Sequence, residues 1–176
     1  MSEAFRGEFN QKVDSKARVS IPAAFRRVLE AGDPNFPGNP RARFILVYGG
    51  ETRRFLECYT LTEMARLERR VARMPVGDKK RIYLTRNLIT RSLEVEIDDD
   101  GRIVLPPKGR DKIELAMAEL KDGSEATFAG MLNAFQIWKR DTYDSDSGQA
   151  GAEQDLLAEG EDMLSLLPPD DDDTEG

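Results

Sequence analysis

The chain has 176 residues, of which 39% are hydrophobic and 34% are charged, with a net charge of -7, one cysteine and no histidine. This length allows one domain, or two small repeats that share a core. Without histidine no Ser-His-Asp or Cys-His nucleophile can be assembled, and one thiolate with carboxylates is a poor zinc ligand set, so we expect no catalytic residue and no metal.

The first half of the chain predicts a strand, a polar turn (DSKA), a second strand ended by a proline, and a helix. A Pro/Gly-rich loop at residues 32–40 then leads to two further strands. Thr60 and Glu63 have the spacing of a capping box, which predicts the start of another helix. The basic segment GDKKRIYLTRNLI follows it. These elements are expected at residues 9–13, 18–21, 23–31, 43–49, 56–59 and 60–74.

The second half repeats this order. VDSKARVSIP at 13–22 matches IDDDGRIVLP at 97–106, with Asp, Arg and Pro at the same offsets. The alanine at position 17, where the second copy has Gly101, indicates that a positive φ is not required in this turn. A less regular helical stretch, two strands and a short final helix follow, at 107–120, 125–130, 135–138 and after Trp138. Because each half alone would leave sheet edges uncovered, we interpret residues 1–84 and 85–143 as pseudo-twofold halves of one barrel-like domain.

Charge is segregated along the chain. Residues 141–176 hold 13 acidic residues and no basic ones, while residues 1–140 hold 26 basic and 20 acidic residues, a net +6. Within that body, residues 1–91 carry +9 and residues 92–140 carry -3. We expect residues 144–176 to be a disordered acidic tail. Its apolar patch, 163–167, is read as part of a solvated tail, with a helix formed on a partner as the alternative.

Other features narrow the class of protein. No apolar run reaches the roughly 18 residues of a membrane span, and MSEAFRGEF lacks the pattern of a secretory signal. Neither a GxGxxG nor a GxxxxGK[ST] motif is present, so we expect no cofactor and no small-molecule substrate. The lone Cys58, in FLECYT, is expected to be a buried thiol. These features predict a cytoplasmic protein with no membrane contact.

Two copies of D-x-x-G-R-[IV]-x-[IL]-P about 80 residues apart, each followed by a glycine and then by L-x-x-Y or F-x-I-W, resemble the MraZ family. This is a family of bacterial transcriptional regulators associated with the division and cell-wall gene cluster, within the AbrB-like, SpoVT-like superfamily. The resemblance covers residues 3–143. It departs at Ala17, where the family has glycine and the turn is expected to be slightly reshaped, and in the loop at 32–40 and the tail.

The resemblance implies an α+β, mainly β fold: a swapped-hairpin (double-split) barrel with peripheral helices. It further implies a ring-like homo-oligomer. The resemblance also implies a nucleoid-associated transcriptional repressor that binds double-stranded DNA at direct repeats upstream of its own gene cluster. DNA-facing residues carried over from the family motif lie in the first turn. They are Asp14, Ser15, Lys16, Ala17 and Arg18.

Residue chemistry assigns roles within this turn. The Arg18 guanidinium can donate two hydrogen bonds to guanine, Lys16 suits a phosphate or a second guanine, and Asp14 is expected to orient Arg18 or to accept backbone N–H groups. In the second copy Asp99 and Asp100 replace Ser15 and Lys16. Those carboxylates would repel phosphate, so the first copy is expected to read DNA and the second to hold the fold or the ring. Secondary DNA contacts are expected at Arg102, Arg26 and Arg86.

Four alternatives stay open from the sequence. Both Asp-Arg pairs could be ion pairs that only stabilise the turns, a reading favoured for Arg102. The chain could be an antitoxin-like or assembly module that acts through a protein partner. An enzyme has only the abundant carboxylates in its favour. The tail itself could mimic nucleic acid and compete for the basic half.

Overall fold

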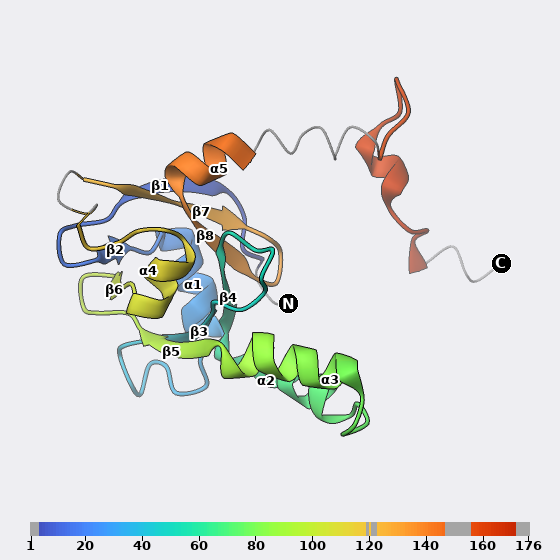
Figure 1. Ribbon diagram of the computed structural model, residues 1–176, viewed down its shortest axis with the longest axis horizontal. Coiled ribbons are helices and arrows are strands. Elements are labelled where there is room, and N and C mark those ends of the chain that lie inside the picture. The colour runs from blue at the N-terminus through green and yellow to red at the C-terminus, as the bar shows by residue number, and fades with distance from the viewer. Residues whose placement is uncertain (1–3, 119, 121–122, 147–155, 172–176) are drawn as a thin grey trace. The chain divides into compact units, whose positions relative to one another are not determined.

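The computed structural model describes residues 4–118, 120, 123–146 and 156–171 (Figure 1). Residues 1–143 form one compact unit and residues 144–176 a second, and each is considered by itself. The first unit combines antiparallel strands with short helices, which confirms the expected α+β class. Its strands are β1 (Glu8–Lys12), β2 (Arg18–Ser20), β3 (Arg43–Val47), β4 (Leu56–Thr60), β5 (Ser92–Glu96), β6 (Arg102–Val104), β7 (Glu125–Gly130) and β8 (Phe135–Lys139).

Six of these strands form one antiparallel sheet in the order β1-β7-β8-β4-β3-β5, and β2 and β6 form a separate two-stranded ribbon. The order reads the same from either edge when each strand is exchanged for its counterpart in the other repeat. The register has this symmetry too: Phe9 pairs with Phe128 at one edge, and Leu93 pairs with Leu46 at the other. The two repeats are therefore interleaved in one sheet, as the pseudo-twofold interpretation requires.

The expected barrel is not closed by hydrogen bonds. Within the described residues the six-stranded ladder ends at β1 on one side and β5 on the other. Pro22 and Pro106 follow the ribbon strands closely and have no N–H to donate, so β2 and β6 are too short to extend either edge of the sheet. The ribbon instead packs through its inner face, where the paired Val19 and Ile103 are each 1% exposed and belong to the main core.

Helices cover the remaining apolar surface. Helix α1 (Ala23–Ala31) buries Phe25, Val28 and Leu29. Helix α2 (Leu61–Ala72) begins at Thr60, whose Oγ1 accepts a hydrogen bond from the Glu63 N–H at 3.0 Å, so the predicted N-cap is confirmed. In Figure 1, α2 and the next helix, α3, extend away from the sheet. The other helices are α3 (Lys79–Leu84), the π-helix η1 (Thr85–Thr90), α4 (Pro107–Lys112) and α5 (Arg140–Asp146).

The helix predicted at 107–120 is shorter than expected. Helix α4 ends at Lys112, and two residues later Glu114 has a φ of +60°, which an α-helix cannot contain. The chain beyond it still packs inward, since Ile113, Leu115 and Leu120 are buried. The short helix expected after Trp138 is present as α5.

The core confirms the expectation for the one cysteine. Cys58 is fully buried, as predicted, and burial raises the pKa of its thiol. Four large aromatic residues are also buried within this chain. They are Phe44, Tyr59, Phe135 and Trp138.

In the second unit, the described segment 156–171 contains the 3-10 helix η4 (Met163–Leu166). Asp162 caps it, because its Oδ1 accepts a hydrogen bond from the Leu164 N–H at 2.8 Å. The apolar side chains of this helix are exposed. Residues 147–155 and 172–176 lie outside the described residues, so disorder of the tail stays a prediction. The division of the first unit at residue 84 also stays a prediction.

Candidate nucleic-acid interface

The first turn is organised by one carboxylate. Asp14 Oδ1 accepts hydrogen bonds from the backbone N–H groups of Lys16 and Arg18, both at 2.9 Å. The backbone closes the turn with bonds from Asp14 N–H to Arg18 O at 3.0 Å and from Ala17 N–H to Asp14 O at 2.9 Å. The N–H of Arg18, followed by its side chain, holds the pKa of Asp14 below its ordinary value. Asp14 therefore stays ionised and fixes the turn, as expected from its position.

The prediction for Ala17 was wrong. Its φ is +63°, and Gly101 in the second turn has a φ of +76°, so both copies require a left-handed residue at this place. The two turns also share the same backbone hydrogen bonds, so the first is not reshaped by its alanine. The Ala17 side chain is 1% exposed and lies in the main core, and burial of its methyl group offsets part of the backbone strain.

The guanidinium of Arg18 is hydrogen-bonded through Nε, while its two Nη groups are free. Its Nε donates to Asp14 Oδ2 at 2.6 Å, and its side chain is about a third exposed, at 34%. Within the described part of the chain, neither of its Nη groups has a hydrogen-bond partner. A guanidinium fixed through Nε presents both Nη groups in one plane, which is the arrangement that a bidentate contact needs. The structure thus positions Arg18 without using its outer donors.

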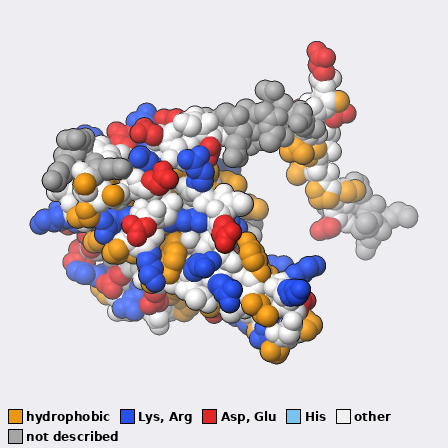
Figure 2. Space-filling view, viewed as in Figure 1, with side chains coloured by type: hydrophobic (Ala, Val, Ile, Leu, Met, Phe, Trp, Pro, Cys, Tyr) orange, Lys and Arg blue, Asp and Glu red, His pale blue; other side chains and the backbone are white. Residues whose placement is uncertain are grey.

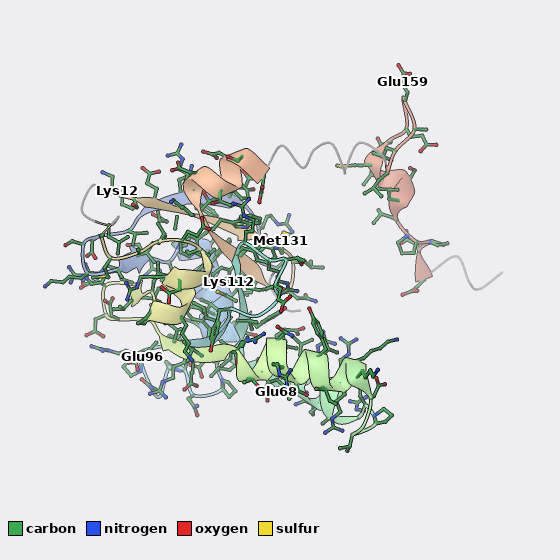
Figure 3. All side chains as sticks on the ribbon, in the orientation of Figure 1. Lys12, Glu68, Glu96, Lys112, Met131 and Glu159 are labelled. Atoms are coloured by element: carbon green, nitrogen blue, oxygen red, sulfur yellow. The ribbon has the colours of Figure 1, made fainter. Side chains whose placement is uncertain are left out.

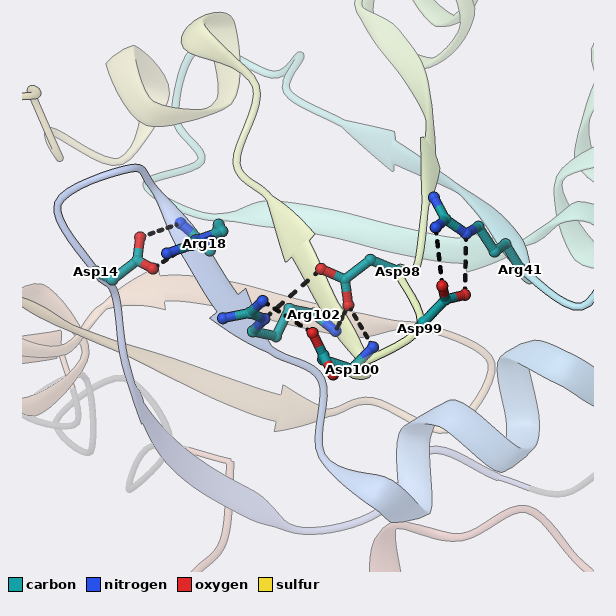
Figure 4. A network of polar contacts seen from close by, with 7 residues as sticks. All are labelled: Asp14, Arg18, Arg41, Asp98, Asp99, Asp100 and Arg102. Atoms are coloured by element: carbon teal, nitrogen blue, oxygen red, sulfur yellow. Dashed lines mark hydrogen bonds and ion pairs between the residues drawn. The ribbon is translucent and has the colours of Figure 1, made fainter.

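The second turn has the same backbone but a different side-chain network (Figure 4). Arg102 uses an Nη group on Asp100, with Nη2 3.1 Å from Oδ2, while its Nε is 3.6 Å from Asp98 Oδ2 and makes no hydrogen bond. The guanidinium of Arg41, which lies two residues before β3, binds both carboxylate oxygens of Asp99 at 3.1 and 3.0 Å. The arginine of this turn is therefore already engaged by an acid.

Formal charges separate the two turns further. Residues 14–18 carry two cations and one carboxylate, while residues 98–102 carry one cation and three carboxylates. Arg41 offsets one of those carboxylates, and the hydrogen bond to Asp99, followed by the charges of Asp99, Glu96 and Asp98, raises the pKa of Arg41 in turn. A net positive turn attracts a phosphate backbone and a net negative one repels it.

The ribbon brings the arginines of the two turns near each other, which the sequence did not predict. Arg18 pairs with Val104 and Ser20 pairs with Arg102, so all four side chains lie on the face opposite the buried Val19. Because the strands are antiparallel, the turns themselves lie at opposite ends of the ribbon. Arg18 and Arg102 are thus diagonal neighbours on one outward face.

The remaining predicted residues fall into two groups. Ser15 and Lys16 are exposed at the tip of the first turn. Arg26, on α1, reaches the second turn instead: its Nη1 lies 2.5 Å from where a Cβ of Gly101 would be, and its buried Nε has no hydrogen-bond partner in the described chain. Arg86 lies in η1, outside both turns and the ribbon. Sequence reasoning missed Arg41, because its bond to Asp99 spans 58 residues.

The fold and the ribbon define a class: a duplicated strand-turn-strand protein with arginines on an exposed two-stranded ribbon, a type of surface that other proteins use to read DNA.

A family profile described as "MraZ protein, putative antitoxin-like" matches residues 88–165. Three relatives share the name "Transcriptional regulator MraZ". The protein from Cereibacter sphaeroides is 62% identical over 167 residues, covering 95% of this chain and 97% of its own. The one from Ruegeria pomeroyi is 43% identical over 170 residues, with 97% and 92% covered. The one from Thermoanaerobacter pseudethanolicus is 28% identical over 160 residues, with 91% and 98% covered.

The chain belongs to the MraZ family of transcriptional regulators, which confirms the resemblance drawn from the repeated motif. Membership in a family of regulators also confirms the expectation that the chain is not an enzyme. Among the described residues, no group of three or more His, Cys, Asp or Glu side chains could hold a metal ion. Nor does this part of the chain contain a helix long and apolar enough to cross a membrane.

Proposed function

We propose that this protein is a sequence-specific DNA-binding repressor that recognises direct repeats upstream of its own division and cell-wall gene cluster. The observation that supports this most directly is the state of Arg18. It is fixed through Nε by an ionised carboxylate, lies on an exposed ribbon, and keeps both Nη groups free. A major groove admits a two-stranded ribbon, and guanine O6 and N7 accept such a pair of donors.

The neighbours of Arg18 complete the reading surface. Lys16 and Ser15, exposed at the tip of the turn, contact phosphates and set the register on the duplex. Asp14 does not touch DNA but positions Arg18, and Ala17 supplies the left-handed bend. Arg102 keeps its acidic partner and acts mainly on the turn, while Arg26 supports that turn from behind.

We call the turn at residues 14–18 of one subunit its DNA-reading head. A single head of this size binds weakly, since one bidentate contact contributes about 1–3 kcal/mol of discrimination. We propose that several copies of the chain assemble into a ring-like homo-oligomer, in the swapped-hairpin arrangement of the superfamily. Such a ring places successive heads on successive repeats and converts weak contacts into avidity. Arg86, in η1, then belongs to the assembly rather than to the head of its own subunit.

Fluorescence anisotropy with labelled duplexes tests the proposal. The upstream region of the gene cluster, the same region with one repeat scrambled, and an unrelated duplex are titrated at two salt concentrations. We expect a preference for the intact repeats that falls as salt rises. Arg18→Ala should lose that preference, about five- to 150-fold in affinity, with no change in oligomer size. Arg69→Ala, which removes an exposed arginine of α2, is the matched control.

Arg102→Ala separates function from turn stability. We expect it to lower the stability of the turn but to change the preference for the repeats much less than Arg18→Ala does. Equal loss of DNA binding from both substitutions in folded protein would show that the two turns have not diverged. No preference over the unrelated duplex in the wild type would refute the proposal and point to a protein partner.

A further inference from the structure

A second cationic cluster lies outside the two turns, around an open surface depression of about 370 Å³. Tyr48, Gly50 and Glu51 follow β3, Arg91 follows η1, and Lys108, Asp111 and Lys112 lie on α4. We call this space the Gly50 cavity. Figure 3 labels Lys112 on the face of the unit where α4 lies, and Figure 2 shows several Lys and Arg side chains gathered on that face, with isolated acidic groups between them.

Two of the residues that line the Gly50 cavity, Gly50 and Arg91, are held in place by Asn87, which does not itself line it. Asn87, in the π-helix, accepts hydrogen bonds at Oδ1 from the Gly50 N–H at 3.0 Å and from an Nη group of Arg91 at 2.8 Å. The loop approaches so closely that a Cβ on Gly49 would lie 1.9 Å from the Asn87 carbonyl oxygen. Gly50 has a φ of +87°. A π-turn inside a helix is rare and recurs at functional sites, so this arrangement points to more than a connection between strands.

The cations of this cavity lack acidic partners. Lys112 donates to the carbonyl oxygen of Gly50, Arg91 donates to an amide oxygen, and the Lys108 ammonium lies 5.7 Å from the centre of the Tyr48 ring. Within the described residues none of the three makes an ion pair, in contrast to the arginines of the turns. Partial burial, followed by the charges of Arg53 and Arg91, lowers the pKa of Lys112. The charge of Glu51 opposes this shift only in part.

We propose that the Gly50 cavity binds a small phosphate-bearing anion, with Arg91, Lys108 and Lys112 as its ligands. The volume suits a diphosphate group or a compact nucleotide and is within the range of small-ligand sites. Three converging cations match an anion with several oxygen acceptors. Glu51 and Asp111, at the edge, oppose binding and limit its strength. The proposal concerns binding by the protein alone and does not depend on its action on DNA.

Isothermal titration calorimetry of the full chain, at constant ionic strength set by chloride, tests this binding. Inorganic pyrophosphate and adenosine diphosphate are the two probes, so a bare diphosphate and a nucleotide are distinguished by which binds more tightly. We expect saturable binding of at least one of them. Lys108→Gln and Lys112→Met should each weaken it about tenfold, since each removes one charge-assisted contact. Arg69→Gln, the same charge change on α2, should leave it unchanged, and Asp111→Asn should tighten it.

The variants differ in their structural risk. Lys112→Met removes a hydrogen bond to Gly50, while the Lys108 side chain makes no hydrogen bond within the described chain, so Lys108→Gln decides the matter if the other variant does not fold. Absence of saturable binding in the wild type would refute the proposal. So would unchanged affinity in Lys108→Gln. Loss of non-specific duplex affinity in Lys108→Gln, with no binding of either small anion, would show that the cluster contacts a nucleic-acid backbone instead.

Discussion

Ala17 and Gly101 occupy equivalent left-handed positions, and replacing each by the other residue tests how the two turns are stabilised. For Ala17→Gly, relief of the left-handed strain is worth about 1–2 kcal/mol. Loss of one buried methyl group costs about 0.8 kcal/mol, and the freedom of glycine in the unfolded chain costs about 0.5–1 kcal/mol. These effects nearly cancel, so we expect a change within about 0.5 kcal/mol.

For Gly101→Ala the same reasoning gives a clear loss. The new residue adopts a φ of +76°, which costs about 1–2 kcal/mol, and the unfolded state returns about 0.5–1 kcal/mol. Its Cβ would lie 2.5 Å from Arg26 Nη1 and 2.9 Å from Cζ, so the guanidinium must move, at roughly 1 kcal/mol more. We therefore expect destabilisation of about 1–2 kcal/mol.

Urea unfolding at matched protein concentration measures both changes, provided that the m-value stays constant. Repeating Gly101→Ala in an Arg26→Ala background isolates the collision. Its cost should fall by about 1 kcal/mol there, because the space above the glycine is then empty. The same cost in both backgrounds would show that Arg26 does not occupy this space. Loss of more than about 2 kcal/mol in Ala17→Gly would refute the cancellation.

Three further predictions concern charge. Asp14→Asn should keep the acceptor for the turn but release the guanidinium of Arg18, so anisotropy should show tighter binding to unrelated duplex and a smaller preference for the repeats; an unchanged preference would exclude a positioning role. Asp99→Asn should free Arg41 and raise duplex affinity at low salt, and the gain should vanish at high salt if it is electrostatic. Backbone N–H groups lower the carboxyl pKa values of Asp14 and Asp98, so both ionised side chains stabilise the fold above their ordinary pKa of 3.8. This stability is lost as pH falls through the lowered pKa values. The melting temperatures of the wild type and Asp14→Ala should therefore converge between pH 6 and pH 2.

Local patterns predicted most elements of this fold because their causes are local. Alternating apolar residues predicted the strands, Pro22 predicted the start of α1, and Thr60 predicted the start of α2. The repeat itself indicated the pairing of the halves, because a half-sheet leaves open edges. Closure of the barrel was predicted and is not seen in the hydrogen bonding, since it depends on strand lengths that proline limits to three residues.

The repeat pointed to the turn residues that we propose as the site, but not to how the fold arranges them. The positive φ of Ala17 was not predicted, because the strain is partly offset by burial of its methyl group, and that burial is visible only in the folded core. The pairing of Arg41 with Asp99 and the placement of Arg26 at Gly101 join segments far apart in the chain. The π-helix has no simple sequence signal, and it positions Asn87.

The pseudo-twofold arrangement bears on the form of the proposed operator. The symmetry passes between Val19 and Ile103, so it relates Arg18 to Arg102 across one ribbon. A ribbon with equal turns would contact DNA equally well in either orientation, as suits a palindrome. Here one turn is net positive and leaves its arginine free, while the other is net negative and engages its arginine with Asp100. The backbone is symmetric and the charge is not, so under the proposed function we expect one orientation on the duplex to be favoured. Identical subunits that each prefer one orientation match repeats that all run in one direction.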